Sequence, residues 1–188
     1  MTLETPPLIL SIQSHVAWGH VGNAAAVFPL QRLGFEVLPV HTVQFSNHTG
    51  YGQFRGQVFG ADHIREIIAG LRERGVLQRV SAVLSGYLGD AGTGAVILDA
   101  VGEIRRENPA VRYLCDPVMG DVGRGVFVNP AIPDFLRDQA MPNANIITPN
   151  QFEFELLTGS KPASVAEAVR TARCLLYTSP SPRDKRQS

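Results

Sequence analysis

Apolar residues occur along this chain in short runs that are rich in β-branched side chains and separated by polar stretches. Five of these runs are short enough to be strands: residues 8–12, 36–43, 82–87, 111–116 and 144–150. Most of their apolar residues are consecutive instead of alternating with polar ones, which is typical of parallel strands covered on both faces. The pattern predicts an α/β fold with a central, mostly parallel sheet and helices on both faces.

Three stretches between these runs have helical features. Residues 61–75 place their apolar side chains on one stripe and their charges on the other side, and residues 91–109 repeat the pattern. Residues 22–34 form a third candidate, in which Pro29 is expected to kink the helix or to lie near its boundary. Strands that alternate with helices indicate βαβ units in one domain without internal repeats.

Composition narrows the class of partner. The chain has 188 residues, 44% of them hydrophobic and 18% charged, which is ordinary for one globular domain. Its 17 basic and 17 acidic residues are scattered, so no basic stripe for a nucleic acid is present and a small-molecule partner is favoured. No apolar run approaches the roughly 18 residues that span a bilayer, and no basic leader precedes a cleavage site, so we expect a cytoplasmic protein that binds no membrane.

Cysteines and histidines give no metal-binding pattern. Cys115 lies inside an apolar run and is expected to be buried and reduced, and Cys174 is far from it in sequence. The five histidines include no pair at i, i+4 spacing. We therefore expect no structural metal site.

Polar residues follow the first strand in "QSHVAWGHVGN". Ligands of open parallel sheets bind beyond the carboxyl ends of the strands, so this stretch is a candidate site. Ser14 can bond a polar ring substituent, and the glycines before Asn23 allow backbone N–H groups to approach a ligand. The alternative is a plain turn in which Asn23 is the helix N-cap.

The second strand is followed by "QFSNHTGYG", which places polar residues between Phe45 and Tyr51. Such a stretch can wrap a flat polar heterocycle, with the aromatic rings stacking on it and the polar side chains bonding its edge. A long surface loop would have a similar composition, so both interpretations stay open here.

Two carboxylates follow the fourth strand in "CDPVMGD". Asp116 stands at the carboxyl end of the strand and Asp121 five residues later. Two carboxylates beside a crevice can hold Mg²⁺ and orient phosphate oxygens. An Asp-Pro turn without further function is the alternative.

Asn150 and Glu153 have the spacing of a helix capping box, and Gly159 is placed to end that helix. Glu153 would then also lie near the positive end of the helix, where a metal-phosphate group can be held. The spacing alone does not separate a structural from a functional role.

The last stretch differs from the rest in composition. Ser164 can cap a helix that begins at Val165, but "CLLYTSPSPRDKRQS" then brings Pro180 and Pro182. Its first part resembles the translation of a sequencing-library adapter, so we assign residues 1–173 to the domain and residues 174–188 to a non-native tail. A disordered regulatory tail is the alternative.

Five motifs in order resemble the pyridoxal kinase family of the ribokinase-like superfamily: "SIQSHVAWGHVGNAAAVFPLQRLGFEV", "VQFSNHTGYG", "VLSGYLGD", "CDPVMGD" and "IITPNQFEFELLTG". The resemblance runs from Leu8 to about Ala172. It implies a usually homodimeric enzyme that transfers the γ-phosphoryl group of ATP, with Mg²⁺ and a monovalent cation such as K⁺, to the 5′-hydroxymethyl group of pyridoxal. Pyridoxine and pyridoxamine are further substrates in that family.

The resemblance also implies roles for residues at matching positions. Those expected to bind the vitamer are Ser14, His48, Thr49, Gly50 and Tyr87. Those expected on the ATP and metal side are Asp116, Asp121, Thr148, Asn150 and Glu153.

One part of the family pattern does not occur in these 188 residues. The family's catalytic base is an aspartate in a late glycine-rich "GxGD" loop, and Gly159 is the only glycine after Asn150. We therefore expect no catalytic residue in this chain, negligible turnover by it, and an uncovered sheet edge. The alternatives are a hydroxymethylpyrimidine kinase of the same superfamily and a protein that binds B6 vitamers without catalysis.

Overall fold

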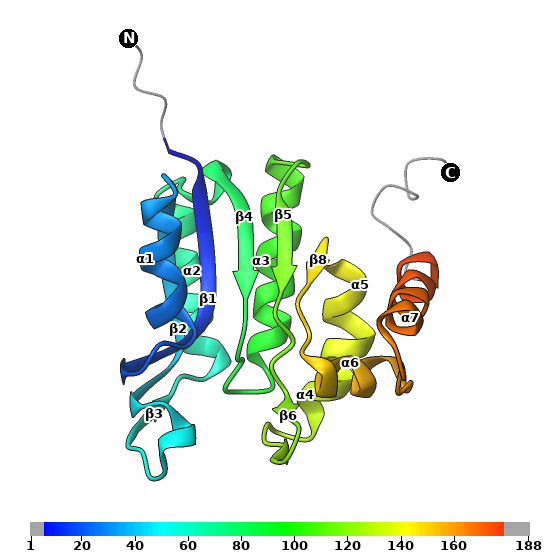
Figure 1. The fold of residues 1–188 in the computed structure, drawn as a ribbon. Coiled ribbons are helices and arrows are strands. Elements are labelled where there is room, and N and C mark those ends of the chain that lie inside the picture. The colour runs from blue at the N-terminus through cyan, green and yellow to red at the C-terminus, as the bar shows by residue number, and fades with distance from the viewer. Residues whose placement is uncertain (1–5, 179–188) are drawn as a thin grey trace.

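Among residues 6–178, a six-stranded sheet forms the centre of the structure (Figure 1). The computed structural model describes the backbone of residues 6–178 and the side chains of residues 6–173. The strands run in the order β3-β2-β1-β4-β5-β8, and every neighbouring pair is parallel except β2 and β3. Their bounds are β1 (Leu8–Trp18), β2 (Glu36–Asn47), β3 (Gly56–Val58), β4 (Val80–Ser85), β5 (Arg112–Cys115) and β8 (Ile146–Ile147). The predicted α/β class with a mostly parallel sheet is confirmed.

Helices and one small hairpin connect the strands. The longer helices are α1 (Asn23–Arg32), α2 (Ala61–Glu73), α3 (Thr93–Glu107), α6 (Gln151–Thr158) and α7 (Val165–Thr178). The shorter helical segments are η1 (Thr49–Tyr51), η2 (Leu77–Arg79), α4 (Ala131–Phe135), η3 (Leu136–Ala140) and α5 (Met141–Asn143). The hairpin consists of β6 (Gly120–Asp121) and β7 (Gly125–Val126), which pair with each other outside the main sheet.

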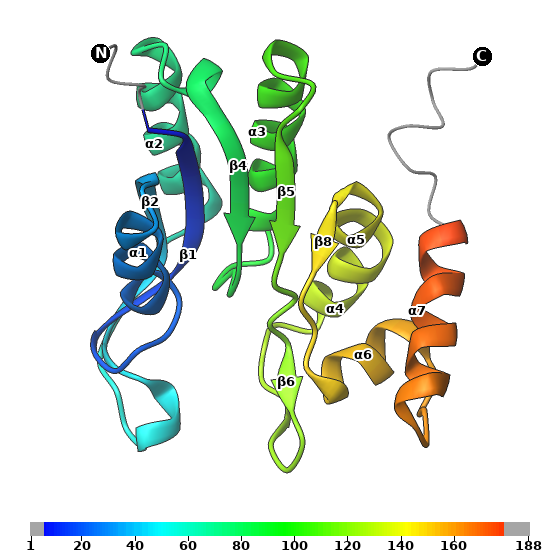
Figure 2. The same cartoon turned by 45° about the horizontal axis from the view of Figure 1, so that its top comes forward.

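Alternate residues of β1 face the two layers of helices. Leu10 and Ile12 are fully buried in the main core, together with apolar residues of α2 and α3. Ser11 faces the other way and bonds Asn23 of α1. Because successive side chains of a strand point to opposite faces, α1 and the pair α2 and α3 cover opposite faces of the sheet, an arrangement that Figure 2 also shows.

The predicted apolar stripe of α2 is confirmed. Ile64 and Ile68 are buried in the core, and Ile67 and Leu71 pack against it while partly exposed. α1 and α3 lie within the two other stretches that were predicted to be helical. Pro29 lies inside α1 and not at its boundary.

The first two strands are longer than predicted, and the carboxyl end of β1 extends beyond its pairing with β4. β1 pairs with β4 only as far as Ile12, but it pairs with β2 as far as Trp18. The prediction that Ser14 follows the strand is therefore wrong, because Ser14 lies within β1 at an irregularity in the register. A small second cluster of Val16, Val43 and Phe45 buries one side of this extension, which explains why these polar stretches remain extended.

The strand β8 lies at one edge of the sheet. In the part of the chain that the structure describes, β5 is its only pairing partner, and half of the Ile146 side chain is exposed. β8 has two residues where the pattern predicted a strand over 144–150, because the chain turns away from the sheet after Thr148 to begin α6.

Cys115 is buried as a free thiol, as predicted, and burial raises the pKa of that thiol. The side chain of Cys174 and the backbone of residues 179–188, to which most of the predicted tail belongs, lie outside the described residues. Ser164 caps α7, since its hydroxyl accepts a bond from the Glu167 N–H at 3.2 Å. Among the helices described, none has both the length and the apolar character needed to cross a membrane.

Candidate functional site

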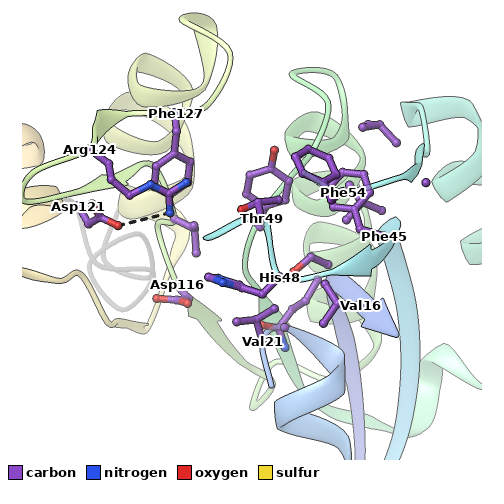
Figure 3. Close-up of a pocket in the computed structure, with 18 residues that line it drawn as sticks. Val16, Val21, Phe45, His48, Thr49, Phe54, Asp116, Asp121, Arg124 and Phe127 are labelled. Atoms are coloured by element: carbon purple, nitrogen blue, oxygen red, sulfur yellow. Dashed lines mark ion pairs between the residues drawn. The ribbon is translucent and has the colours of Figure 1, made fainter. Parts of the chain in front are cut away.

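A cavity of about 750 Å³ opens at the carboxyl ends of the parallel strands (Figure 3). This volume suits a small organic ligand, and parallel sheets bind ligands at this end of their strands. Its walls come from β1, β2, β3, the segments after β4 and β5, and the β6–β7 hairpin. The lining residues are Gln13, Ser14, Val16, Val21, Gly22, Val43, Phe45, His48, Thr49, Phe54, Gly56, Val58, Tyr87, Asp116, Val118, Asp121, Arg124 and Phe127.

Ser14 and Gly22 meet at one side of the cavity. Gly22 has φ +53°, and a Cβ atom there would lie 2.2 Å from the Ser14 carbonyl oxygen and 2.4 Å from Ser14 Oγ. Only glycine permits this approach. The chain between β1 and α1 therefore passes directly over the hydroxyl that was predicted to bond a ligand.

Asn23 does not cap α1, so that alternative interpretation is wrong. The N-cap position is held by Gly22, and Asn23 is the first helical residue, only 2% exposed. Its side chain turns toward the sheet because Ser11 and the Val40 carbonyl offer hydrogen-bonding partners in an otherwise apolar interior.

The segment after β2 forms part of the cavity wall. The His48 N–H donates to the Trp18 carbonyl at 3.0 Å, which fastens this segment to the end of β1. His48 Nδ1 accepts a bond from the Gly50 N–H at 3.2 Å. His48 and Thr49 line the cavity as predicted, whereas Gly50 does not; its missing side chain leaves room for the His48 ring, which a Cβ atom would approach to 2.8 Å.

The aromatic wall differs from the prediction. Phe45 lines the cavity, but its neighbour there is Phe54, with ring centroids 4.6 Å apart. Tyr51 is exposed and packs against Trp18 outside the cavity. The antiparallel return of β3 beside β2, which pairs Phe45 with Gly56, brings Phe54 into this position.

Tyr87 supplies a phenol from the segment after β4. Thr42 Oγ1 donates to the Tyr87 carbonyl at 2.6 Å and so ties this segment to β2. Burial raises the pKa of Tyr87, so its hydroxyl is neutral at physiological pH and can donate a hydrogen bond.

Two carboxylates occupy the opposite wall. Thr148 Oγ1 donates to Asp116 Oδ1 at 2.9 Å. Burial raises the pKa of Asp116, and the Thr148 bond opposes that shift. Asp121 and Arg124 form a loose ion pair at 3.8 Å, and the Arg124 guanidinium lies 4.9 Å from the Phe127 ring centre; Figure 3 shows these three side chains together on the hairpin.

The predicted capping box at the start of α6 is confirmed. Asn150 Oδ1 accepts from the Glu153 N–H, and Glu153 Oε2 accepts from the Asn150 N–H, both at 2.9 Å. Gly159 ends the helix in the left-handed conformation.

The same two side chains hold the segment that carries the carboxylates. Glu153 Oε1 accepts from the Met119 N–H at 3.0 Å, and Asn150 Nδ2 donates to the Gly120 carbonyl at 2.9 Å. Burial raises the pKa of Glu153, and the hydrogen bonds that its carboxylate accepts from the Asn150 and Met119 N–H groups oppose this shift. Thr148, Asn150 and Glu153 do not line the cavity, so in the structure they orient Asp116 and the segment that follows it.

The donor set around the cavity fits a magnesium ion that is held mainly by substrate phosphates. Asp116 and Asp121 both line the cavity, and Mg²⁺ in phosphoryl-transfer sites is commonly bound through one or two carboxylates, waters and phosphate oxygens. Glu153 fits less well as a direct ligand, because both of its oxygens already accept backbone N–H bonds. Among the described residues, no group of three or more His, Cys, Asp or Glu side chains is arranged to hold a metal ion by itself.

Sequence reasoning missed several lining residues, of which Gln13, Phe54, Arg124 and Phe127 are the largest. Gln13 belongs to the first quoted motif, but nothing in the sequence indicates that this buried residue of β1 lines the cavity. Arg124 and Phe127 depend on the β6–β7 hairpin, which strand patterns do not predict because each of its strands has two residues.

The fold and the cavity together define a class: an α/β protein with a small-molecule site at the carboxyl edge of a parallel sheet, where a hydroxyl-bearing and aromatic wall faces two carboxylates. A comparison with family profiles matches residues 64–181 to the family described as phosphomethylpyrimidine kinase. The chain belongs to this family.

Individual relatives are pyridoxal kinases. The chain is 58% identical to pyridoxal kinase PdxY of Deinococcus radiodurans over 93% of its own length and 59% of the relative's, and 59% identical to that of Granulibacter bethesdensis over 89% and 58%. The chain thus spans about three fifths of the length of the curated relatives it matches. The resemblance to pyridoxal kinases that the five motifs indicated is confirmed.

Solved structures agree with the sequence relatives. Pyridoxal kinase from Leishmania donovani, in complex with ADP and pyridoxamine, is 35% identical with a TM-score of 0.87, over 94% of this chain and 60% of that one. Pyridoxal kinase from Entamoeba histolytica is 28% identical with a TM-score of 0.86, over 95% and 62%.

Proposed function

We propose that this chain forms the vitamer-binding part of a pyridoxal kinase, which transfers the γ-phosphoryl group of ATP to the 5′-hydroxymethyl group of pyridoxal. The observation that carries the proposal is the convergence of Ser14, Thr49 and Tyr87 with Asp116 in one cavity of suitable size. The identities of 58% and 59% with pyridoxal kinases support it. We assign the activity to a protein of the relatives' full length.

The wall formed by β1, β2 and β3 is suited to a substituted pyridine. The Ser14 hydroxyl bonds the ring nitrogen, and the Phe45 and Phe54 rings pack against the flat heterocycle. His48, Thr49 and the neutral Tyr87 hydroxyl bond the polar ring substituents, with Gly50 shaping the turn that carries them. These interactions fix the position of the 5′-hydroxymethyl group, and positioning is a large part of phosphoryl-transfer catalysis.

The opposite wall is suited to ATP and Mg²⁺. Asp116 and Asp121 hold the ion through its waters, while Thr148, Asn150 and Glu153 keep their segment in place. When bound, Mg²⁺ supplies charge that stabilises the transferring phosphoryl group. The ADP in the Leishmania donovani structure supports a nucleotide partner. A monovalent cation such as K⁺ is part of the proposal by family resemblance alone.

A homodimer is the proposed assembly, with α1 as its contact helix. Phe28 of α1 and Leu33, the residue that follows the helix, are 68% and 73% exposed, and most residues of α1 are apolar. Exposed large apolar side chains on one element are typical of contact surfaces. Phe28→Glu is expected to shift sedimentation from dimer to monomer, and an unchanged dimer would place the contact elsewhere.

Hydroxymethylpyrimidine kinase is the second candidate function. It is favoured by the description of the matching family profile, which names a phosphorylated pyrimidine. The relatives compared above are nevertheless pyridoxal kinases, and the same cavity would admit either heterocyclic alcohol. The third candidate function is that of a protein that binds B6 vitamers without catalysis. In that case we expect the vitamer to bind and no product to form.

One assay separates the three candidates. A protein of the relatives' length, carrying residues 1–173 of this chain in its native reading frame, is incubated with Mg·ATP and either pyridoxal or 4-amino-5-hydroxymethyl-2-methylpyrimidine. We expect pyridoxal 5′-phosphate to form with stoichiometric ADP, and the pyrimidine to react much more slowly. Preferred reaction of the pyrimidine supports the second candidate, and no product from a well-folded protein overturns the kinase proposal.

A further inference from the structure

A buried chain of polar side chains leads from α1 to the cavity. It consists of Asn23, Ser11 and Gln13, which are at most 7% exposed. Ser11 Oγ and Asn23 Oδ1 are 2.7 Å apart, and Gln13 Nε2 and Ser11 Oγ are 2.9 Å apart. Gln13 is the end of this chain and also lines the cavity. Buried polar groups need partners, so the direction of each bond is constrained by the next.

The orientation of the Asn23 side-chain amide determines which groups donate and which accept along this chain. Its side-chain nitrogen faces the Val40 carbonyl oxygen at 3.1 Å, which can only accept a hydrogen bond. The same nitrogen lies 3.0 Å from His41 Nδ1. Reversing the Asn23 amide would place two carbonyl oxygens against each other. Asn23 Oδ1 therefore faces Ser11 and has to accept.

The constraint then passes through Ser11 to Gln13. The hydroxyl of Ser11 has one hydrogen, and it donates that hydrogen to Asn23 Oδ1. Toward Gln13 it can therefore only accept, which requires the Gln13 side-chain nitrogen to face Ser11. The Gln13 amide has one orientation as a result, with its carbonyl oxygen on the side away from Ser11.

Gly86 leaves the space that this oxygen occupies. A Cβ atom at Gly86 would lie 2.7 Å from Gln13 Oε1. Gly86 directly precedes the lining residue Tyr87, so the oxygen is held at the end of β4 beside the cavity. Among the described residues, the hydrogen bonding of the Gln13 side chain is confined to Ser11.

We infer that Gln13 is a specificity-determining residue, which presents a fixed hydrogen-bond acceptor to a hydroxyl group of the ligand. Asn23 and Ser11 are positioning residues that prevent the amide from turning. The inference rests on the proposed function, because it takes the ligand to be a hydroxylated pyridine whose ring nitrogen bonds Ser14. A site built to accept from a hydroxyl discriminates against the analogue that lacks it, because the acceptor is then left unpaired.

The test is calorimetric titration of the 188-residue chain with pyridoxine and with three analogues, each lacking one of its hydroxyl groups. For the wild-type chain we expect one analogue to bind about tenfold more weakly than pyridoxine. In Gln13→Met the ratio of the pyridoxine affinity to the affinity of this analogue falls to about one or two, because no acceptor remains. Ser11→Ala also reduces this ratio, because the Gln13 amide is then no longer fixed.

Gln57→Met is the matched control. It makes the same chemical change at an exposed position of β3 that does not line the cavity, and it should leave the ratio unchanged. If Gln13→Met leaves the affinity ratio of pyridoxine to each of the three analogues unaltered, the inference is overturned. If that variant does not fold, the Ser11→Ala ratio decides instead, and a ratio equal to that of the wild type overturns the inference. Absence of vitamer binding by the wild-type chain overturns both this inference and the proposed function, whereas binding without such coupling overturns the inference alone.

Discussion

At the scale of single residues, Gly22 lies so close to Ser14 that the cavity wall has no room for a side chain at this position. Gly22→Ala adds a Cβ atom 2.2 Å from the Ser14 carbonyl in a backbone conformation that disfavours side chains. We expect the free energy of unfolding to fall by about 2–3 kcal/mol and vitamer binding to be lost. Chemical denaturation and calorimetric titration measure the two effects.

Gly34→Ala is the control for this change. Gly34 also has a positive φ, +89°, but nothing lies within 4 Å of the Cβ position. Its substitution should cost only the conformational strain, about 1 kcal/mol, and leave binding intact. Equal losses of stability in both variants would contradict the close approach as the cause.

Asp116 is charged at a cost to stability. Because burial raises its pKa in the folded chain above the unfolded value, the folded state binds a proton more readily than the unfolded state. This carboxyl group therefore destabilises the fold at neutral pH, and the penalty is relieved as the pH falls through the folded pKa. We expect Asp116→Asn to raise the melting temperature at pH 7, with a difference that shrinks toward acidic pH.

The same substitution should abolish the effect of Mg·ATP on the melting temperature, since the proposed carboxylate is gone. Asp99→Asn on α3, away from the cavity, is the control and should change neither quantity. A melting temperature of Asp116→Asn below that of the wild type at pH 7 would show that the Thr148 bond outweighs the burial of the charge.

The site residues that the sequence predicted are those attached to regular strand ends. Tyr87 and Asp116 converge because the carboxyl ends of parallel strands lie at the same edge of the sheet. Ser14 joins them although it lies within β1, because β1 continues past the end of its pairing with β4. Phe54 and Arg124 could not be found in this way, because their places depend on the antiparallel return of β3 and on a two-residue hairpin. The Gln13 orientation depends on three side chains from different elements, which no local pattern contains.

At the scale of elements, the start of α6 fixes the segment between β5 and β6. The Glu153 carboxylate accepts from the N–H groups of Met119 and Asn150, and it is only 3% exposed. Glu153→Gln turns an NH₂ group toward one of these donors and leaves it unpaired. We expect a loss of about 1–3 kcal/mol in the free energy of unfolding and weaker binding of Mg·ATP.

Glu155→Gln supplies the comparison on the same helix. Among the described residues, Glu155 accepts only from the exposed Gln151 side chain, so its substitution should change stability by less than about 0.5 kcal/mol. Similar losses in the two variants would contradict the role of α6 in holding the Asp116 segment.

Helix and strand positions were predicted where the pattern was long and regular. The stripe of α2 and the capping box of α6 were read correctly, because both depend on neighbours within one turn. The extension of β1 and β2 was not, because it depends on the packing of Val16 against Val43 and Phe45 from a different strand. The predicted strand over 144–150 was too long because Thr148 bonds Asp116 and the chain then begins α6.

At the scale of the whole molecule, the cavity joins two parts of the chain. One wall comes from β1, β2, β3 and the segment after β4, and the other from the segment after β5 and the β6–β7 hairpin. Figure 3 shows Phe45 and Phe54 on one side, and Asp121 and Arg124 on the other. The first wall bears the hydroxyl, phenol and aromatic groups suited to a pyridine, and the second bears the carboxylates suited to a metal-bound phosphate. This division explains why the chain is expected to bind the vitamer even where turnover requires further residues.

The most direct measurement is calorimetric titration of the 188-residue chain with pyridoxal and with 4-amino-5-hydroxymethyl-2-methylpyrimidine under the same conditions. We predict saturable binding of pyridoxal at one molecule per chain, lost in Ser14→Ala, and binding of the pyrimidine that is at least about tenfold weaker. Equal or tighter binding of the pyrimidine, or no binding of pyridoxal by the folded chain, would contradict the assignment of this cavity to a B6 vitamer.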